Sequence, residues 1–150
     1  MPDFAVTRAH LVSACQQRNW DLLDKLLDLD ASRINDNALF TDTWGMWWGM
    51  LLECAATGAA DGVRVLLKHG AQRDAASWGD GEVVAPLEAA RENPEIVALL
   101  ESPAPPVYVR KTDPPLPTGE TTEDEAINRK GAIRDKTGLV FQTKATKPPE

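Results

Sequence analysis

Residues 49–71 constrain the fold more than any other stretch of this sequence, because they hold two apolar patterns separated by a glycine. Leu51, Cys54 and Ala55 stand at i, i+3 and i+4, which places them on one face of a short helix. Gly58 ends that helix, since glycine accepts the left-handed turn after a last carbonyl. A second apolar run follows and is closed by a glycine in the same way. Two such short helices cannot bury both faces alone, so the sequence predicts similar helix pairs beside them.

The neighbouring segments repeat this pattern. Residues 14–31 (ACQQRNWDLLDKLLDLDA) align without a gap on residues 54–71 (CAATGAADGVRVLLKHGA). Small residues face small residues at the start of the alignment, and paired apolar residues face each other near its end. A third copy, 85–100, keeps the pattern but is shorter between its helices. The predicted copies cover about residues 7–31, 49–71 and 85–101.

The repeated unit resembles the ankyrin repeat. The Thr-Pro-Leu-His-x-Ala opening of that family is matched in part by residues 85–90 (APLEAA), and its Gly-Ala after the second helix by Gly70-Ala71. The opening threonine is absent from all three copies, and Asp30 replaces the first closing glycine. The first two copies are 40 residues apart (54 − 14), against about 33 in the family, so the surplus is read as lengthened loops.

The resemblance implies an all-α fold. It predicts a short ankyrin-repeat solenoid of helix pairs over residues 1–101, with long inter-repeat loops. An extended, proline-rich tail follows in residues 102–150, where eight of the 11 prolines lie.

Local signals set the ends of several helices. Thr7 and Asn19 are suitable N-caps for the two helices of the first copy, and Asn93 followed by Pro94 marks a third helix start. The helix after Asn19 is expected to bury one apolar stripe and to carry its charged residues on the opposite side. The apolar stripe is Trp20, Leu23, Leu26 and Leu27, and the charged residues are Asp21, Asp24, Lys25 and Asp28.

The two cysteines are expected to be reduced core residues. Cys15 and Cys54 fall near equivalent sites on the first helices of successive copies. Packed helices lie roughly 8–10 Å apart, which is too far for a disulfide without backbone movement. Small apolar packing is therefore the expected role of both thiols.

Charge narrows the classes of partner. Residues 1–101 carry 8 Lys/Arg and 16 Asp/Glu, a net −8, whereas residues 102–150 carry 8 and 7, a net +1. An acidic repeat array is a poor nucleic-acid binder, because that affinity comes from neutralising phosphates. It favours a protein with a basic surface. No stretch is long and apolar enough to span a membrane, and residues 1–7 lack a signal-peptide pattern. We expect no membrane partner and a cytoplasmic location.

Tryptophan is concentrated in the two long connections between copies, residues 33–48 and 72–84. The resemblance implies that these connections project as hairpin-like fingers where the family binds partners. Tryptophan is enriched among interface hot spots because it buries much area with few rotatable bonds. Acidic neighbours would form a rim around such an anchor. The candidate partner-binding residues are Trp44, Met46, Trp47, Trp48, Trp78, Asp42, Asp80 and Glu82.

A packing role competes with partner contact for some of these indoles. Trp47 and Trp48 are adjacent and cannot share one face of a strand, so partner contact and loop packing stay equally open for them. Partner contact is favoured for Trp44 and Trp78. Trp20 lies on a helix stripe and is expected in the core.

Catalytic and cofactor-binding patterns find little support in the sequence. The two histidines, His10 and His69, are not part of any Cys/His set with zinc spacing. Gly79-Asp80-Gly81 has the composition of a turn more than of a phosphate cradle. The sequence therefore predicts no enzyme activity, no metal and no cofactor.

The tail holds two further patterns and a local excess of positive charge. Residues 122–133 have a capping box and predict one helix, and residues 138–143 read as a short strand. Residues 126–149 carry six basic residues and one acidic residue, a net +5. This charge suggests that the tail folds back on the acidic repeats; disorder and a plain spacer are the alternatives.

These features favour a small, non-enzymatic protein-binding module. One form is an inhibitor or immunity protein that blocks a toxin or effector enzyme. The alternatives are an adaptor that joins two partners through repeats and tail, and an accessory subunit that stabilises an enzyme. A monomer is favoured.

Overall fold

The computed structural model describes residues 4–41, 45–79, 83–117 and 127–128. Helices make up most of the regular secondary structure, and six helices fall within the described residues. A helix long and apolar enough to cross a membrane is absent from these residues. The helices are α1 (Arg8–Gln16), α2 (Trp20–Leu29), α3 (Met50–Ala56), α4 (Ala60–Lys68), α5 (Pro86–Ala89) and α6 (Pro94–Glu101).

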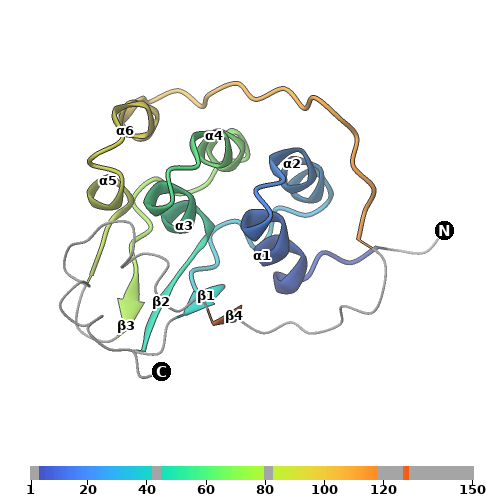
Figure 1. Cartoon of the computed structure of the whole chain (residues 1–150), viewed down its shortest axis with the longest axis horizontal. Coiled ribbons are helices and arrows are strands. Elements are labelled where there is room, and N and C mark those ends of the chain that lie inside the picture. Colours follow the sequence, from blue (N-terminus) through green and yellow to red (C-terminus); the bar gives the residue numbers. More distant parts are fainter. Residues whose placement is uncertain (1–3, 42–44, 80–82, 118–126, 129–150) are drawn as a thin grey trace.

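The helices form three successive pairs arranged in two layers (Figure 1). Within each pair a short turn joins the two helices, which pack against each other. Helices α1, α3 and α5 form one layer, and α2, α4 and α6 form the other, with neighbours in contact along each layer. The predicted helix pairs are therefore present, although α5 is reduced to a single turn.

Helix starts follow the predicted capping chemistry. The Thr7 hydroxyl accepts a hydrogen bond from the His10 amide (3.2 Å), and the Asn19 side chain accepts one from Leu22 (3.2 Å). Asn93 caps α6 in the same way, with Pro94 at the first helical position. Because each cap satisfies an otherwise unpaired amide, these local signals fixed the helix boundaries correctly.

The first two pairs share one turn geometry. The amide of Asn19 donates to Ala14 and the amide of Ala59 donates to Cys54, both at 2.9 Å. Left-handed backbone precedes both amides, with φ of 55° at Arg18 and 73° at Gly58. The offset of 40 residues in the sequence alignment therefore holds in the backbone.

The core lies between the two helix layers. Leu23, Leu26 and Leu27 are buried as predicted, and Cys15 and Cys54 are buried and free of disulfide. Trp20 is only half-buried, packed against the edge of this core. A Cβ on Gly62 would lie 2.9 Å from the Trp20 ring and 2.6 Å from the Cys54 sulfur, so only glycine leaves room for this packing.

The long connections between pairs form a small sheet together with two residues of the tail, which corrects the all-α prediction. The order is β3-β2-β1-β4; β1 and β2 are antiparallel, β2 and β3 are antiparallel, and β4 runs parallel to β1. The sheet extends from one end of the helix layers (Figure 1). Its strands are β1 (Phe40–Thr41), β2 (Met46–Trp48), β3 (Trp78–Gly79) and β4 (Ile127–Asn128).

The tail leaves the helices at Ser102, which ends α6 as predicted. We refer to residues 103–117 as the arm. The arm is extended and runs past α4 and α2 towards α1 (Figure 1). The predicted helix over 122–133 is wrong at Ile127 and Asn128, which form a strand. The rest of that helix, the strand over 138–143 and the basic residues from 129 on lie outside the described residues.

Candidate functional site

Strand β2 places its two tryptophans on opposite faces of the sheet. Trp47 pairs with Thr41 on one side and with Trp78 on the other, while Trp48 pairs with Phe40. Since successive side chains of a strand alternate between faces, Trp47 and Trp48 separate as their adjacency required. The sheet therefore has an inner face at Trp48 and an outer face at Trp47.

Trp48 belongs to the core. It is 1% exposed, and its ring stacks on Phe40 with centroids 6.2 Å apart. Its indole N–H donates to a carboxylate oxygen of Glu53, a buried residue of α3, at 2.8 Å. This bond anchors the base of the sheet to the helices. For Trp48, packing rather than partner contact is the role that the geometry assigns.

Trp47 and Trp78 form a stacked pair on the outer face. Their ring centroids are 6.0 Å apart and their planes differ by 14°. Trp78 is 46% exposed, and its N–H donates to the main-chain oxygen of Asn37 at 2.8 Å, which fixes the ring. Trp47 is half-buried. The pair is a rigid aromatic surface, with one indole held in place by a hydrogen bond.

The other sequence candidates divide into one buried residue and four that cannot be placed. Met46 is 1% exposed and lies inside, so its assignment to a partner surface is wrong in this structure. Its side chain points inward because it shares the inner face with Trp48. The remaining candidates, Trp44, Asp42, Asp80 and Glu82, lie outside the described residues.

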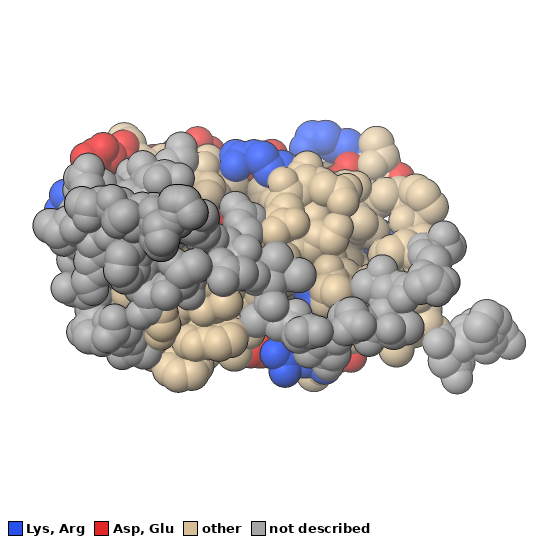
Figure 2. All heavy atoms as spheres, turned by 60° about the horizontal axis from the view of Figure 1, so that its bottom comes forward, with Lys and Arg blue, Asp and Glu red and all other residues tan. Residues whose placement is uncertain are grey.

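Two exposed apolar side chains follow β3 along the chain. After β3, Val83 and Leu87 are exposed apolar side chains, 66% and 42% accessible. Figure 2, turned so that the sheet end comes forward, shows basic and acidic residues next to each other along the margins and uncharged residues between them. The predicted acidic rim stays a prediction, because Asp42, Asp80 and Glu82 lie outside the described residues.

A second group of contacts lies away from the sheet, where the arm packs on α2. The charged residues of this helix take the side away from the apolar stripe, as predicted, but the arm covers them. Asp24 is 1% exposed, and Tyr108 of the arm is 7% exposed. Lys25 donates to Asp113 (2.8 Å) and to the Pro114 carbonyl (2.7 Å). This side of α2 is an internal contact surface.

Asp21 receives four hydrogen bonds from the arm. The Tyr108 hydroxyl donates to it at 2.5 Å, the amides of Lys111 and Thr112 at 3.2 and 3.0 Å, and the Thr112 hydroxyl at 2.8 Å. Burial tends to raise the pKa of Asp21, but these donors outweigh it and lower the pKa to about 2. Burial and the Asp21 carboxylate together raise the pKa of Tyr108. Asp21 is thus held as an anion that accepts hydrogen bonds.

Asp24 is the centre of a charge network between α2, α4 and the arm. Lys68 and His69 contact its Oδ1 at 2.9 and 2.7 Å, and Nε of Arg110 donates to its Oδ2 at 2.9 Å. The same guanidinium also pairs with Asp28. Burial acts to raise the pKa of Asp24, but the contacts with Lys68 and His69 prevail and lower it. Three cationic or donor side chains therefore compensate this buried carboxylate.

Ligand atoms of Asp24, Asp28 and His69 all lie within 4.8 Å of one another, a spacing that suits a metal ion. The guanidinium of Arg110 contacts both carboxylates, and Lys68 contacts one of them. With two cationic side chains already on these oxygens, the cluster fits an ion-pair network better than a metal centre.

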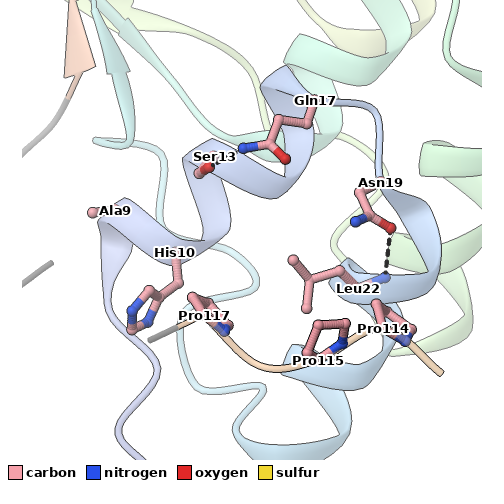
Figure 3. A pocket seen from close by; sticks show the side chains of 9 residues that line it. All are labelled: Ala9, His10, Ser13, Gln17, Asn19, Leu22, Pro114, Pro115 and Pro117. Atoms are coloured by element: carbon pink, nitrogen blue, oxygen red, sulfur yellow. Dashed lines mark hydrogen bonds between the residues drawn. The ribbon is translucent and has the colours of Figure 1, made fainter. Parts of the chain in front are cut away.

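A cavity of about 460 Å³ lies between α1, α2 and the end of the arm (Figure 3). Its polar side chains are already bonded within the chain. Gln17 donates to Ser13, Asn19 caps α2, and Nδ1 of His10 accepts from the Thr7 amide. Burial lowers the pKa of His10. Among the described residues that line the cavity, no group of unbonded polar side chains points to one spot, so the lining does not indicate a ligand.

The charge of the tail suggests that it folds back on the acidic repeats, but it indicates none of the contacts that the arm makes. Asp21, Asp24 and Asp28 recur at the i, i+3, i+7 spacing of one helix face, and Tyr108 and Arg110 recur at the period of two of an extended segment. Matching an acidic helix face to an alternating aromatic and basic segment would have suggested the contact. Nothing in the spacing alone names the partner.

Comparison of the chain with protein-family models, curated proteins and solved structures gave no match. The outer face of the sheet and the arm-covered face of α2 and α4 are thus the two sites from which function is argued.

Proposed function

We propose that this chain is a non-enzymatic protein-binding module of the ankyrin type that recognises a protein partner through the outer face of its sheet. The observation that carries the proposal is the stacked pair of Trp47 and Trp78, one ring of which is 46% exposed. An exposed indole held by its own hydrogen bond loses little conformational freedom on binding. Hot spots of protein interfaces are enriched in such residues.

The architecture supports the same proposal. Helix pairs in two layers with projecting strands at one end suit a repeat module, and the first two copies share their turn geometry. The net charge of −7 favours a partner with a basic surface. The proposal includes no cofactor, no metal, no nucleic acid and a monomeric state.

The test compares two surface tryptophans with a control on another surface. The full chain captures a partner, and the affinity of the purified pair is then measured for Trp47→Ala, Trp78→Ala and Leu29→Ala. Leu29 is a matched control because it is a 54% exposed apolar residue at the end of α2. We expect each tryptophan variant to lose about 2 kcal/mol of binding free energy or more, and the control to bind as the parent.

The contradicting result is unchanged affinity with a lower melting temperature, which would make the pair a packing element. If a partner is found, adding the chain to it distinguishes the forms of the module. An inhibitor lowers the partner's activity in proportion to the chain added, an accessory subunit preserves that activity, and an adaptor retains two proteins at once. The arm-covered face is the observation that favours the adaptor as second candidate.

A further inference from the structure

Every described hydrogen bond between the arm and the helices has a side chain on at least one of its two ends. Across residues 103–117 no main-chain to main-chain hydrogen bond is described; the arm's carbonyls and amides meet side chains instead. Lys68 donates to the Tyr108 carbonyl at 3.1 Å, Arg73 to the Ala104 carbonyl at 3.3 Å, and Lys25 to that of Pro114. An extended segment held only in this way can leave without breaking any helix or strand ladder. The arm is therefore bound as a peptide ligand would be.

Two side chains of the arm insert into the helical face, and their neighbours do not. Tyr108 is buried between Lys68 and Lys111, whose nitrogens lie 5.9 and 5.2 Å from its ring centroid. Val107 and Val109 are 79% and 72% exposed. Because of this alternation, the helical face contacts every second side chain of the arm, namely Tyr108 and, two positions later, Arg110.

The face recognises a tyrosine hydroxyl, a guanidinium and a following turn. Asp21 accepts from the Tyr108 hydroxyl and also from the amides of Lys111 and Thr112, which any residue except proline would supply. Asp24 and Asp28 together hold the guanidinium of Arg110. Specificity therefore comes from the Tyr-x-Arg pair, and the turn after it contributes main-chain affinity.

Most of this face is assembled without the arm. Asp24 is held by Lys68 and His69, which come from α4 and its C-cap, so its position is set by the packing of α2 against α4. For Asp21, by contrast, every described hydrogen bond comes from the arm. The face thus combines a preformed guanidinium site with a carboxylate whose described partners leave together with the arm.

We propose that the face of α2 and α4 is a second protein-binding site, which takes an extended segment of another protein containing tyrosine followed two residues later by arginine. The arm is its resident occupant and is displaced by that segment. This site goes beyond the proposed function, because it lies on the helix layer that carries Asp21, Asp24 and Asp28 and shares no residue with the outer face of the sheet.

The arm is covalently joined to α6, which explains why only a competing segment would displace it from the face. A segment attached by a short linker has an effective concentration on the order of millimolar at its own site. A segment of another protein can bind only those molecules whose site is uncovered, so its apparent affinity falls in proportion to the uncovered fraction. Weakening the arm in cis should therefore strengthen binding in trans.

The test uses the full chain and a fluorescent synthetic peptide with the sequence of residues 103–117. We expect the variant carrying Tyr108→Ala and Arg110→Ala to bind this peptide at least tenfold more tightly than the parent chain. Adding Asp21→Asn to that variant should weaken peptide binding at least tenfold. Adding Asp74→Asn, a matched change at an exposed aspartate outside this face, should leave it unchanged. Peptides with Tyr108→Phe or Arg110→Lys should bind more weakly.

A second measurement covers the case in which the double variant fails to fold. In the full chain with Asp21→Asn alone, trypsin should cleave after Arg110 and Lys111 at least tenfold faster, while Asp74→Asn leaves the rate at the parental level. Absence of peptide binding to the folded double variant, or binding that ignores Asp21→Asn, overturns the proposal. Parental trypsin rates with Asp21→Asn overturn it as well. An arm-dependent dimer in size-exclusion chromatography would assign the site to the arm of a second copy instead.

Discussion

The two sites differ in what occupies them and in the chemistry that they use. The outer face of the sheet presents the stacked rings of Trp47 and Trp78, and the ring of Trp78 is exposed. Among the described hydrogen bonds of the sheet's tryptophans, a carboxylate takes part only through Glu53, which bonds Trp48 on the inner face. The face of α2 and α4 uses the carboxylates of Asp21, Asp24 and Asp28, and its own arm covers it. One site is open and aromatic, and the other is closed and ionic.

This difference predicts different kinds of recognition. An aromatic pair binds through buried area and tolerates salt, whereas a site of ion pairs and charge-assisted hydrogen bonds depends on ionic strength and on matching donors. A covered site also sets a threshold, since a competitor must displace the arm. A chain with both sites is suited to holding one partner steadily and a second one conditionally.

The largest expected effect separates the two faces of the sheet itself. Trp48→Ala should lower the free energy of unfolding by about 3–5 kcal/mol, because it removes a buried ring and its hydrogen bond to Glu53. Trp47→Ala, one residue earlier on the outer face, should cost about 1 kcal/mol. Urea denaturation followed by circular dichroism measures both. Equal losses for the two variants would remove the distinction between an inner and an outer face.

A smaller effect should separate the two central aspartates of α2. Asp24→Asn should lower the free energy of unfolding by about 2–3 kcal/mol, because Asp24 compensates cationic groups of α4 as well as of the arm. Asp21→Asn should cost less, about 1.5 kcal/mol, which corresponds to the tenfold release of the arm, because its described partners belong only to the arm. Thermal unfolding of both variants, with Asp74→Asn as control, checks this order. A reversed order would mean that the arm, and not α4, holds the network.

Local chemistry in the sequence was enough for much of the helical part. Thr7 and Asn19 cap helices where they were expected to, because a capping side chain satisfies amides only a few residues away. The separation of Trp47 and Trp48 also followed from the strand period. Which of the two would be buried did not follow, since it depends on the register of Trp48 with Phe40 and on the hydrogen bond to Glu53 of the next helix.

Contacts between residues far apart in the sequence could not be predicted from local sequence patterns. Asp24 looked like one of several charged residues on one side of α2, and its burial depends on Arg110, 86 residues further on. The strand at Ile127 and Asn128 replaced part of an expected helix, because pairing with β1 outweighs a local capping signal. The ankyrin resemblance stays a proposal for the same reason: repeated helix pairs constrain the local turns more than the family.

The smallest expected effect is a pH response confined to the arm side. The folded-state pKa of Asp21, about 2, lies below its ordinary value of 3.8, so its ionised form favours the attached arm above about pH 4. That contribution is lost as the pH falls through about 2. The amide resonances of Lys111 and Thr112, which donate to Asp21, should therefore titrate in NMR spectra with a midpoint near pH 2.

The sheet side supplies the control for this titration. The indole N–H of Trp78 donates to the main-chain carbonyl of Asn37, which has no proton to gain in this range. Its resonance should stay in place while those of Lys111 and Thr112 move, and Asp21→Asn should abolish the movement of the latter two. A midpoint near 3.8 would mean that the donors of the arm do not hold Asp21 as an anion, and the two sites would then no longer differ in the chemistry of their anchors.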